Sequence, residues 1–354
     1  MPQRSPREQL ELDCSRAQPI SRQSFSGADL SGADLKGGTF EKVNFRAANL
    51  RGADLREAVF TDCDLGGADL TDARMCHAMW HDCKAKESSL RGADLREVQF
   101  FMSDLSGADM KEAQLRDVNF VRCQLAGLDL SGTQSETLNL LESDTTRIDL
   151  SGARLSRCVF MNADLTQAGL SQTQLHYAVW LKVKLSGCDL SQLRCERVQF
   201  GQSDLTEAVL RGVSFEKGIS FYGATLDGAD FEGARADVAN FVQASLVGAN
   251  LKRLRAREAL FVEADLSSCE LSDADLARAV FQDAVCVGAR FTGATLTYAD
   301  FSRADLTQAD FSSASMFRAR FHAVREAETI WGDRSSALGD DPALRRAENW
   351  KPTY

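Results

Sequence analysis

The 354-residue chain has few prolines and no long apolar runs. All five prolines lie outside or at the edge of residues 20–331. Because proline lacks a backbone N–H, its absence over so long a stretch indicates that the main-chain N–H groups there form a hydrogen-bonded ladder. No apolar run approaches the length of a membrane-spanning segment, so we expect no membrane span.

The chain also has fewer basic than acidic residues. Lys and Arg number 41 against 51 Asp and Glu, which gives a net charge of −10. This balance disfavours direct binding of nucleic acid, which requires clustered basic residues. The N-terminal residues MPQRSPREQLELDC contain no apolar segment typical of a signal peptide. With ten cysteines and no export signal, we expect reduced thiols and a cytoplasmic location; secretion by a route that ignores N-terminal signals stays open.

What the chain does have is a large apolar residue at every fifth position. The phase runs from Ile20 to Phe215, shifts by one residue within EKGIS (216–220), and resumes from Phe221 to Trp331. Of these 63 central positions, 55 are Leu, Phe, Met, Trp or Ile. A small residue, most often Ala, stands two positions before each centre, and Asp or Asn frequently stands directly before it.

A five-residue period fits neither a regular helix nor a straight strand. In extended backbone, alternate side chains share one side, so the small residue and the large centre both point inward. A corner every five residues resets this alternation, and Gly supplies permissive backbone at many corners. The pattern therefore predicts a coil of short strands and corners.

The segments FSGADLSGADL and RGADLREAVF resemble the pentapeptide-repeat family, with its A(D/N)LXX motif. The resemblance covers about residues 18–331. It implies an all-β fold, a right-handed quadrilateral β-helix with four pentapeptides per coil, and hence about 16 coils.

The sequence contains its own test of a twenty-residue coil. Every twentieth centre from Ile20, continued from Phe221 after the extra residue, is Phe or Trp in 14 of 16 cases. We call this side the aromatic face. The acidic face has its centres at Leu30, Leu50 and so on, and the arginine face at Leu35, Leu55 and so on.

A solenoid contacts only neighbouring coils, so its ends need caps. We expect residues 1–17 to form an N-terminal cap, residues 18–331 the β-helix with its one-residue insertion near 216–220, and residues 332–354 a C-terminal cap. Within the last segment, Asp341 and Pro342 predict the start of a short helix. We expect Trp331 and Trp350 to lie over the last coil.

The aromatic face is unusual in carrying apolar residues on its outside as well. The outward positions beside its centres include Val59, Met79, Phe101, Val121, Leu141, Val159, Met161, Val179, Leu181, Tyr222, Val242, Leu260, Val262 and Val280. Scattered surface apolar residues are ordinary, but a continuous stripe marks an interface. We therefore predict a non-enzymatic interaction scaffold that uses this face to bind a protein partner or a second copy of itself.

Two further function hypotheses come from resemblance. The tail IWGDRSSALGDDPALRRAENW looks similar to tails of pentapeptide proteins that accompany type VI secretion systems, which suggests an accessory or adaptor role. The acidic face suggests the family's DNA-mimicking members, which bind DNA gyrase. Against the second hypothesis, Asp before the centre is what the motif prescribes, arginines interleave with it, and the chain has no projecting loop.

Residues with catalytic or metal-binding chemistry do not form a convincing site. The segment CHAMWHDC offers Cys76, His77, His81 and Cys83, but the repeat phase points Cys83 inward and spreads the others over two sides. No nucleophile–base constellation or phosphate-binding glycine loop is present. We therefore expect no enzyme activity, no metal and no cofactor. The coil around residues 133–147 is irregular, because Ser135 and Thr145 replace apolar centres.

Overall fold

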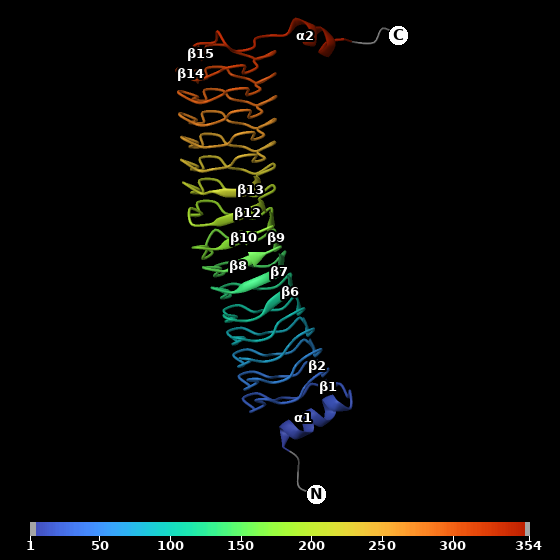
Figure 1. Ribbon diagram of the computed structural model, residues 1–354. Helices are drawn as coiled ribbons and strands as arrows, with labels where there is room; N and C mark the ends of the chain where they lie inside the picture. The colour runs from blue at the N-terminus through green and yellow to red at the C-terminus, as the bar shows by residue number, and fades with distance from the viewer. Residues whose placement is uncertain (1–4, 351–354) are drawn as a thin grey trace, which may run out of the picture. The chain divides into compact units, whose positions relative to one another are not determined.

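The chain folds into a parallel β-solenoid of about 16 turns, with short helices near the two ends of the sequence (Figure 1). The computed structural model describes residues 5–350. The chain forms two compact units, Met1–Lys184 (unit 1) and Leu185–Tyr354 (unit 2), which are described in turn. The predicted pentapeptide solenoid is confirmed.

Unit 1 contains one helix and a ladder of short strands. Partners in the ladder are parallel and twenty residues apart, as in Phe40 with Phe60 and Phe100 with Phe120. The elements are α1 (Pro6–Ser15), β1 (Ile20–Ser21), β2 (Thr39–Glu41), β3 (Val59–Thr61), β4 (Met79–His81), β5 (Gln99–Phe101), β6 (Leu115–Val121), β7 (Gln134–Leu141), β8 (Arg154–Ser156), β9 (Val159–Met161), β10 (Gln174–His176) and β11 (Val179–Leu181).

Unit 2 has fewer named strands, because most of its coils pair through single bridges such as Leu260 with Val280. Its elements are β12 (Arg194–Gln199), β13 (Phe215–Ser220), β14 (Asp310–Phe311), β15 (Ile330–Trp331) and α2 (Pro342–Glu348). Between β12 and β13 the register shifts by one residue: Cys195 faces Phe215, but Val198 faces Ile219.

The core of each unit is a set of columns built from the central residues. On the aromatic face of unit 1, Phe40 stacks on Phe60 with ring centroids 4.9 Å apart, and Phe100 on Phe120 at 4.8 Å. In unit 2, Phe241, Phe261, Phe281 and Phe301 stack in sequence at 4.8, 4.7 and 4.5 Å. All of these rings are fully buried. The alternation of inward centres and outward neighbours thus builds the predicted aromatic column within each unit.

The corners explain the composition of the repeat. The N–H of Ala53 donates to the carbonyl of Leu50 at 3.0 Å, and the corner residue between them, Gly52, has φ +61°. This left-handed conformation suits glycine best. The next corner has Glu57 at φ +61°, so the coil imposes the conformation on other residues as well.

Helix α1 lies against the first coils of unit 1 (Figure 1). Ser5 and Glu8 form a capping box at its start. The helix buries Leu10 and Cys14, and the Arg7 guanidinium donates to the carbonyl of Ser31 at 2.7 Å. Apolar and polar contacts together hold the helix on the coils.

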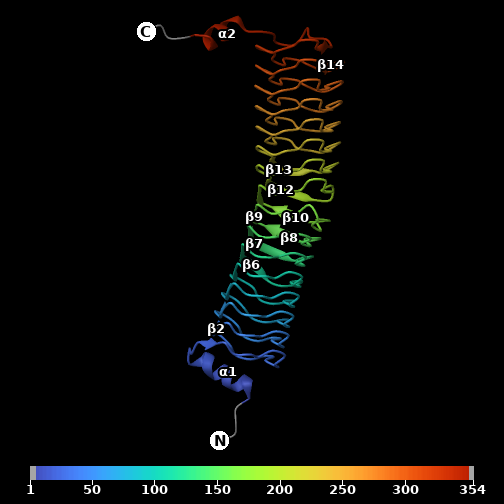
Figure 2. The ribbon, with the colours of Figure 1, turned by 180° about the vertical axis from the view of Figure 1, so that it is seen from behind.

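At the far end of unit 2, the chain beyond β15 pairs with the last coil. The N–H of Leu338 donates to the carbonyl of Ala319, and the N–H of Phe321 donates to that of Leu338, both at 2.8 Å. Trp331 stacks on Phe311 at 4.9 Å, as expected. The expectation for Trp350 is wrong, since this residue is 72 % exposed. Figure 2 shows the reason: α2 lies beside the last coils of unit 2 rather than across them.

In the irregular coil of unit 1, the polar central residues are buried and form hydrogen bonds with backbone carbonyls. The Ser135 hydroxyl donates to the carbonyl of Leu115 at 2.8 Å, and the Thr145 hydroxyl to that of Asp164 at 2.9 Å. A buried hydroxyl with a partner avoids most of the cost of losing its contact with water. The repeat therefore tolerates these substitutions.

Candidate functional site

The outward apolar residues of unit 1 form two rows on the aromatic face. In one row, which we call the apolar row, strand register places Phe101 beside Val121, Val121 beside Leu141, Leu141 beside Met161, and Met161 beside Leu181. All five side chains are partly exposed. The row spans five consecutive strands without a polar residue.

The second row of unit 1 is interrupted by amides. Val59 pairs with Met79, and Val159 with Val179, but Gln99, Asn119 and Asn139 stand between these pairs. Asn139 donates to Asn119 at 2.6 Å, and Asn119 to Gln99 at 2.8 Å. This row is therefore less uniformly apolar than the first.

In unit 2 the predicted residues form a shorter patch. Backbone hydrogen bonds join the coils of Tyr222, Val242 and Val262, and a bridge joins Leu260 to Val280. Tyr222 is 42 % and Leu260 is 40 % exposed. On either side of the Leu260–Val280 bridge, the same row carries Asn240 and Asp300.

The acidic face is crossed by ion pairs. In unit 1, Arg91 lies 3.1 Å from Asp109, and Lys111 lies 2.6 Å from Asp129. In unit 2, Arg211 bonds Asp230. Several carboxylates of this face are thus compensated at close range.

The arginine face of unit 1 begins with side-chain clamps. Arg56 donates to both carboxylate oxygens of Asp54, and Arg96 does the same to Asp94. These hydrogen bonds hold the pKa of both carboxyls below its ordinary value. Each Asp also accepts from the backbone N–H two residues later, which fixes the corner.

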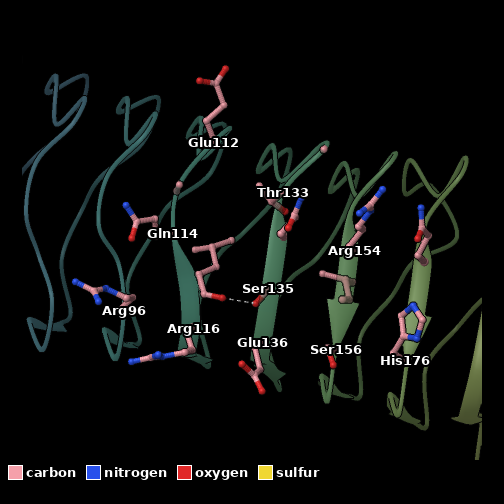
Figure 3. Close-up of a pocket in the computed structure, with 16 residues that line it drawn as sticks. Arg96, Glu112, Gln114, Arg116, Thr133, Ser135, Glu136, Arg154, Ser156 and His176 are labelled. Atoms are coloured by element: carbon pink, nitrogen blue, oxygen red, sulfur yellow. Dashed lines mark hydrogen bonds between the residues drawn. The ribbon is translucent and has the colours of Figure 1, made fainter.

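Further along this face of unit 1 lies a groove of about 710 Å³ (Figure 3). It crosses β6, β7, β8 and β10, and Figure 3 shows Gln114, Arg116, Glu136, Arg154 and His176 projecting outward from these strands. Its polar lining includes Gln114, Gln134, Arg154, Gln174, Glu136 and Ser156. We did not predict this groove from the sequence; the signal is the run of three Gln and one Arg after coils that carry Asp34, Asp54, Arg74 and Asp94 at the same position.

The histidine and cysteine side chains of CHAMWHDC do not lie together in one site. Cys83 is buried, His81 is exposed on the aromatic face, and His77 lies 3.1 Å from Glu97. Within residues 5–350, no group of three or more His, Cys, Asp or Glu side chains is arranged to hold a metal ion. All ten cysteines are free thiols, and burial raises the pKa of Cys123 to about 11.

An exposed aromatic pair in unit 2 was also missed from the sequence. Tyr298 and Phe317 are each 47 % exposed, and their rings meet edge to face at 5.7 Å. They occupy a corner and an outward position on the arginine face, away from the stripe that we predicted.

Family models confirm what the coil geometry indicates. A model described as "Pentapeptide repeat region" matches residues 33–110. A second, described as "Pentapeptide repeats (8 copies)", matches six overlapping or successive segments between residues 99 and 322. The chain is a pentapeptide-repeat protein.

Several solved structures of pentapeptide-repeat proteins are similar to this one. Full-length QnrB1, a plasmid-mediated fluoroquinolone resistance protein, is 16% identical; the match covers 57% of this chain and 92% of QnrB1, with a TM-score of 0.43. HetL, involved in heterocyst differentiation regulation in the cyanobacterium Nostoc sp. strain PCC 7120, is 23% identical; the match covers 87% of this chain and 94% of HetL, with a TM-score of 0.29. No curated protein matches the chain significantly in sequence.

Pentapeptide-repeat proteins are in general structural or interaction proteins rather than enzymes. No helix within residues 5–350 is long and apolar enough to cross a membrane. Unit 1 carries two outward surfaces of different chemistry: the apolar row on one face and the polar groove on another.

Proposed function

We propose that this pentapeptide-repeat protein is a non-enzymatic scaffold that binds another protein through the aromatic face of unit 1. The observation that carries the proposal is the apolar row: Phe101, Val121, Leu141, Met161 and Leu181 lie on five successive paired strands. Outward positions on the other faces of unit 1 are mostly charged or polar. A continuous apolar row on such a surface favours a docking role.

The size of the apolar row indicates what kind of interface it serves. Five coils at about 4.8 Å, each presenting about 10 Å of strand, give roughly 240 Å². At about 25 cal/mol per Å², its burial contributes roughly 6 kcal/mol, which is comparable to the cost of association. A standard interface buries about 800 Å² per partner. The row therefore fits the apolar centre of a larger interface with a polar rim.

The size of the apolar row favours a different protein as the partner over a second copy of the chain. Homodimer interfaces are larger and more apolar than interfaces between proteins that also exist alone. Polar side chains flank the middle of the apolar row, with the Asn119 and Asn139 amides on one side and the Arg122–Glu142 pair at 2.9 Å on the other. We therefore propose a partner with an apolar contact residue at the centre and hydrogen-bonding groups around it.

The other two hypotheses have less support. The ion pairs that cross the acidic face oppose mimicry of DNA, because they compensate several of the carboxylates that would imitate phosphates, among them Asp109, Asp129 and Asp230. The role beside a type VI secretion system stays a prediction that depends on the resemblance of the C-terminal tail.

Site-specific photocrosslinking tests the proposal. A benzophenone amino acid at Leu141, in the apolar row, should crosslink a partner protein in the native host, whereas the same probe at Gln124, on the face between the aromatic and acidic faces, should not. Adding Val121→Asp and Leu181→Asp should abolish the crosslink. Gln124→Asp with Ser171→Asp is the matched control, because both residues are exposed and lie outside the aromatic face.

Circular dichroism should show that both double variants keep the fold. A crosslink that survives Val121→Asp with Leu181→Asp would contradict the proposal. A crosslink only to another copy of the chain would contradict it as well.

A further inference from the structure

The groove on the arginine face of unit 1 contains a row of unusual side chains. Strand register places Arg154 directly between Gln134 on one neighbouring strand and Gln174 on the other. Gln114 occupies the equivalent position one coil earlier than Gln134. In Figure 3, Gln114 and Arg154 lie in this row, while Arg116, Glu136, Ser156 and His176 form a second row beside it.

In earlier coils the equivalent side chains are paired; Arg74, for example, lies 3.3 Å from Asp54. At the same position, Asp54 and Asp94 are clamped by Arg56 and Arg96. Within the part of the chain that the structure describes, the side chains of Gln114, Gln134, Arg154 and Gln174 form no hydrogen bond or ion pair; their donors and acceptors face the groove and solvent.

The charges of the groove leave one group uncompensated. Glu112 lies 3.0 Å from Arg91, and Glu136 lies 3.0 Å from Arg157, so arginines outside the lining neutralise both acids. The arginines Arg96 and Arg116 lie near Asp94 and Asp117, at 2.7 and 3.7 Å. Among the lining residues, Arg154 is the guanidinium without an acidic partner in residues 5–350. A ligand with a carboxylate complements it, because a guanidinium binds carboxylate in a bidentate fashion.

The amides on either side narrow the class of ligand. A primary amide donates and accepts hydrogen bonds, as a peptide group does. Gln134 and Gln174 are two coils apart, which is about 9.6 Å at the usual strand spacing. Three residues of extended chain cover about 10 Å, so an extended segment running across the strands can meet both amides. The volume of about 710 Å³ is in the range of ligand pockets.

We propose that this groove binds an acidic polypeptide segment in extended conformation, with one carboxylate on Arg154 and main-chain amide groups on Gln134 and Gln174. The segment runs across β7, β8 and β10. The site lies on a different face from the apolar row, so it is independent of the proposed scaffold function.

Binding of short peptides tests the proposal directly. The probes are acetylated, amidated five-residue peptides with Glu at the centre and mixed neutral residues around it, compared with the same peptides with Gln at the centre. Titration calorimetry of the full chain should show binding of Glu peptides at least tenfold tighter than of Gln peptides, despite the protein's net charge of −10. Arg154→Gln should remove this difference, and Arg154→Lys should restore part of it.

Arg235→Gln is the matched control. Arg235 occupies the equivalent position on the arginine face of unit 2 and has no ion partner among the described residues, but its neighbours are Ser214 and Arg255 instead of two amides. This variant should bind Glu peptides as the unaltered chain does.

Three results would overturn the proposal: Glu peptides that bind Arg154→Gln equally well, an equal loss in Arg235→Gln, or acetate alone that binds as tightly as the peptides. Gln134→Ala with Gln174→Ala gives a separate check. It should weaken Glu and Gln peptides alike, and an unchanged affinity for both would contradict the role of the amides.

Discussion

His322 Nε2 lies 3.1 Å from Glu348 Oε2, and this contact joins the last complete coil of unit 2 to helix α2. The other ring nitrogen accepts from the backbone N–H of Asp341, the N-cap of α2, at 3.1 Å. His322 is fully buried, whereas α2 buries none of its own residues. A polar contact, not apolar packing, therefore holds this helix in place.

Replacing His322 should release α2 without unfolding the coils. In His322→Ala, both contacts with the helix are lost, which leaves the exposed Arg303–Glu348 pair at 3.3 Å and the hydrogen bond from the Ala323 N–H to Asp340, just before the helix, at 3.2 Å. We expect trypsin to cleave at Arg345 and Arg346 at least several times faster, while far-ultraviolet circular dichroism stays nearly unchanged. His81→Ala, at an exposed histidine of unit 1, is the control and should leave the cleavage rate unaltered.

Trp80 provides a test of the aromatic column in unit 1. The ring is buried between Phe60 at 5.2 Å and Phe100 at 5.4 Å, but its indole N–H has no hydrogen-bond partner among residues 5–350. Trp80→Phe removes this unpaired donor, which offsets the lost ring area, so we expect the free energy of unfolding to change by less than about 1 kcal/mol. Trp80→Ala should lower it by about 3–5 kcal/mol.

Urea denaturation of the two variants measures both values. Suppose that Trp80→Phe lowers the free energy of unfolding as much as Trp80→Ala does. Removing the unpaired N–H would then bring no compensation, and an aromatic ring at this position would not by itself stabilise the column.

Acid should destabilise the protein through its clamped aspartates. Hydrogen bonds from Arg56, Arg96 and Ser312 lower the pKa of Asp54, Asp94 and Asp310. A carboxyl with a depressed pKa in the folded state contributes stability that is present above its unfolded value, about 3.9, and is lost as the pH falls through the folded pKa. We therefore expect the urea midpoint to be flat from about pH 7 to 5 and to fall below about pH 4.

Asp54→Asn should reduce this fall, because the amide keeps an oxygen for the corner but carries no charge. A urea midpoint that rises below pH 4 would contradict the assignment.

One of the ten thiols should react in the folded protein, and the other nine should react after unfolding. Burial raises the pKa of Cys123 to about 11 and the pKa values of Cys158, Cys195 and Cys269 to about 12. Cys76 is the one cysteine that is partly exposed; the other nine are buried. We expect Ellman's reagent at pH 8.5 to label one thiol in the folded protein and ten in urea. Cys76→Ser should remove the native signal, and its persistence would show that a buried coil opens.

The five-residue period was sufficient to predict the interior. It places Phe60, Phe100 and Phe261 inward whatever residues surround them, because each centre repeats the same geometry. It also places Val121 and Leu181 outward on one face. For these residues the position within the repeat determines the environment, so sequence and structure agree.

The five-residue period does not predict the groove or the arrangement at the end of unit 2. The groove depends on side chains that fail to form the Asp–Arg clamp, so it arises from absent contacts that no period describes. The place of Trp350 depends on His322 and Glu348, which hold α2 beside the coil. Contacts between a non-repeating tail and one particular coil have no counterpart elsewhere in the chain, and so the sequence pattern could not predict them.

The one-residue shift near Gly218 changes the spacing of the repeat along the sequence but leaves the stacking of the buried rings intact. Phe200 and Phe221 are twenty-one residues apart, yet their rings still stack with centroids 5.5 Å apart. The extra residue is taken up at the corner, where Gly218 has φ +89°. A corner of this kind can lengthen while the buried column keeps its order, so it offers a place where evolution or an experimenter can add an outward loop to unit 2 at little cost to folding.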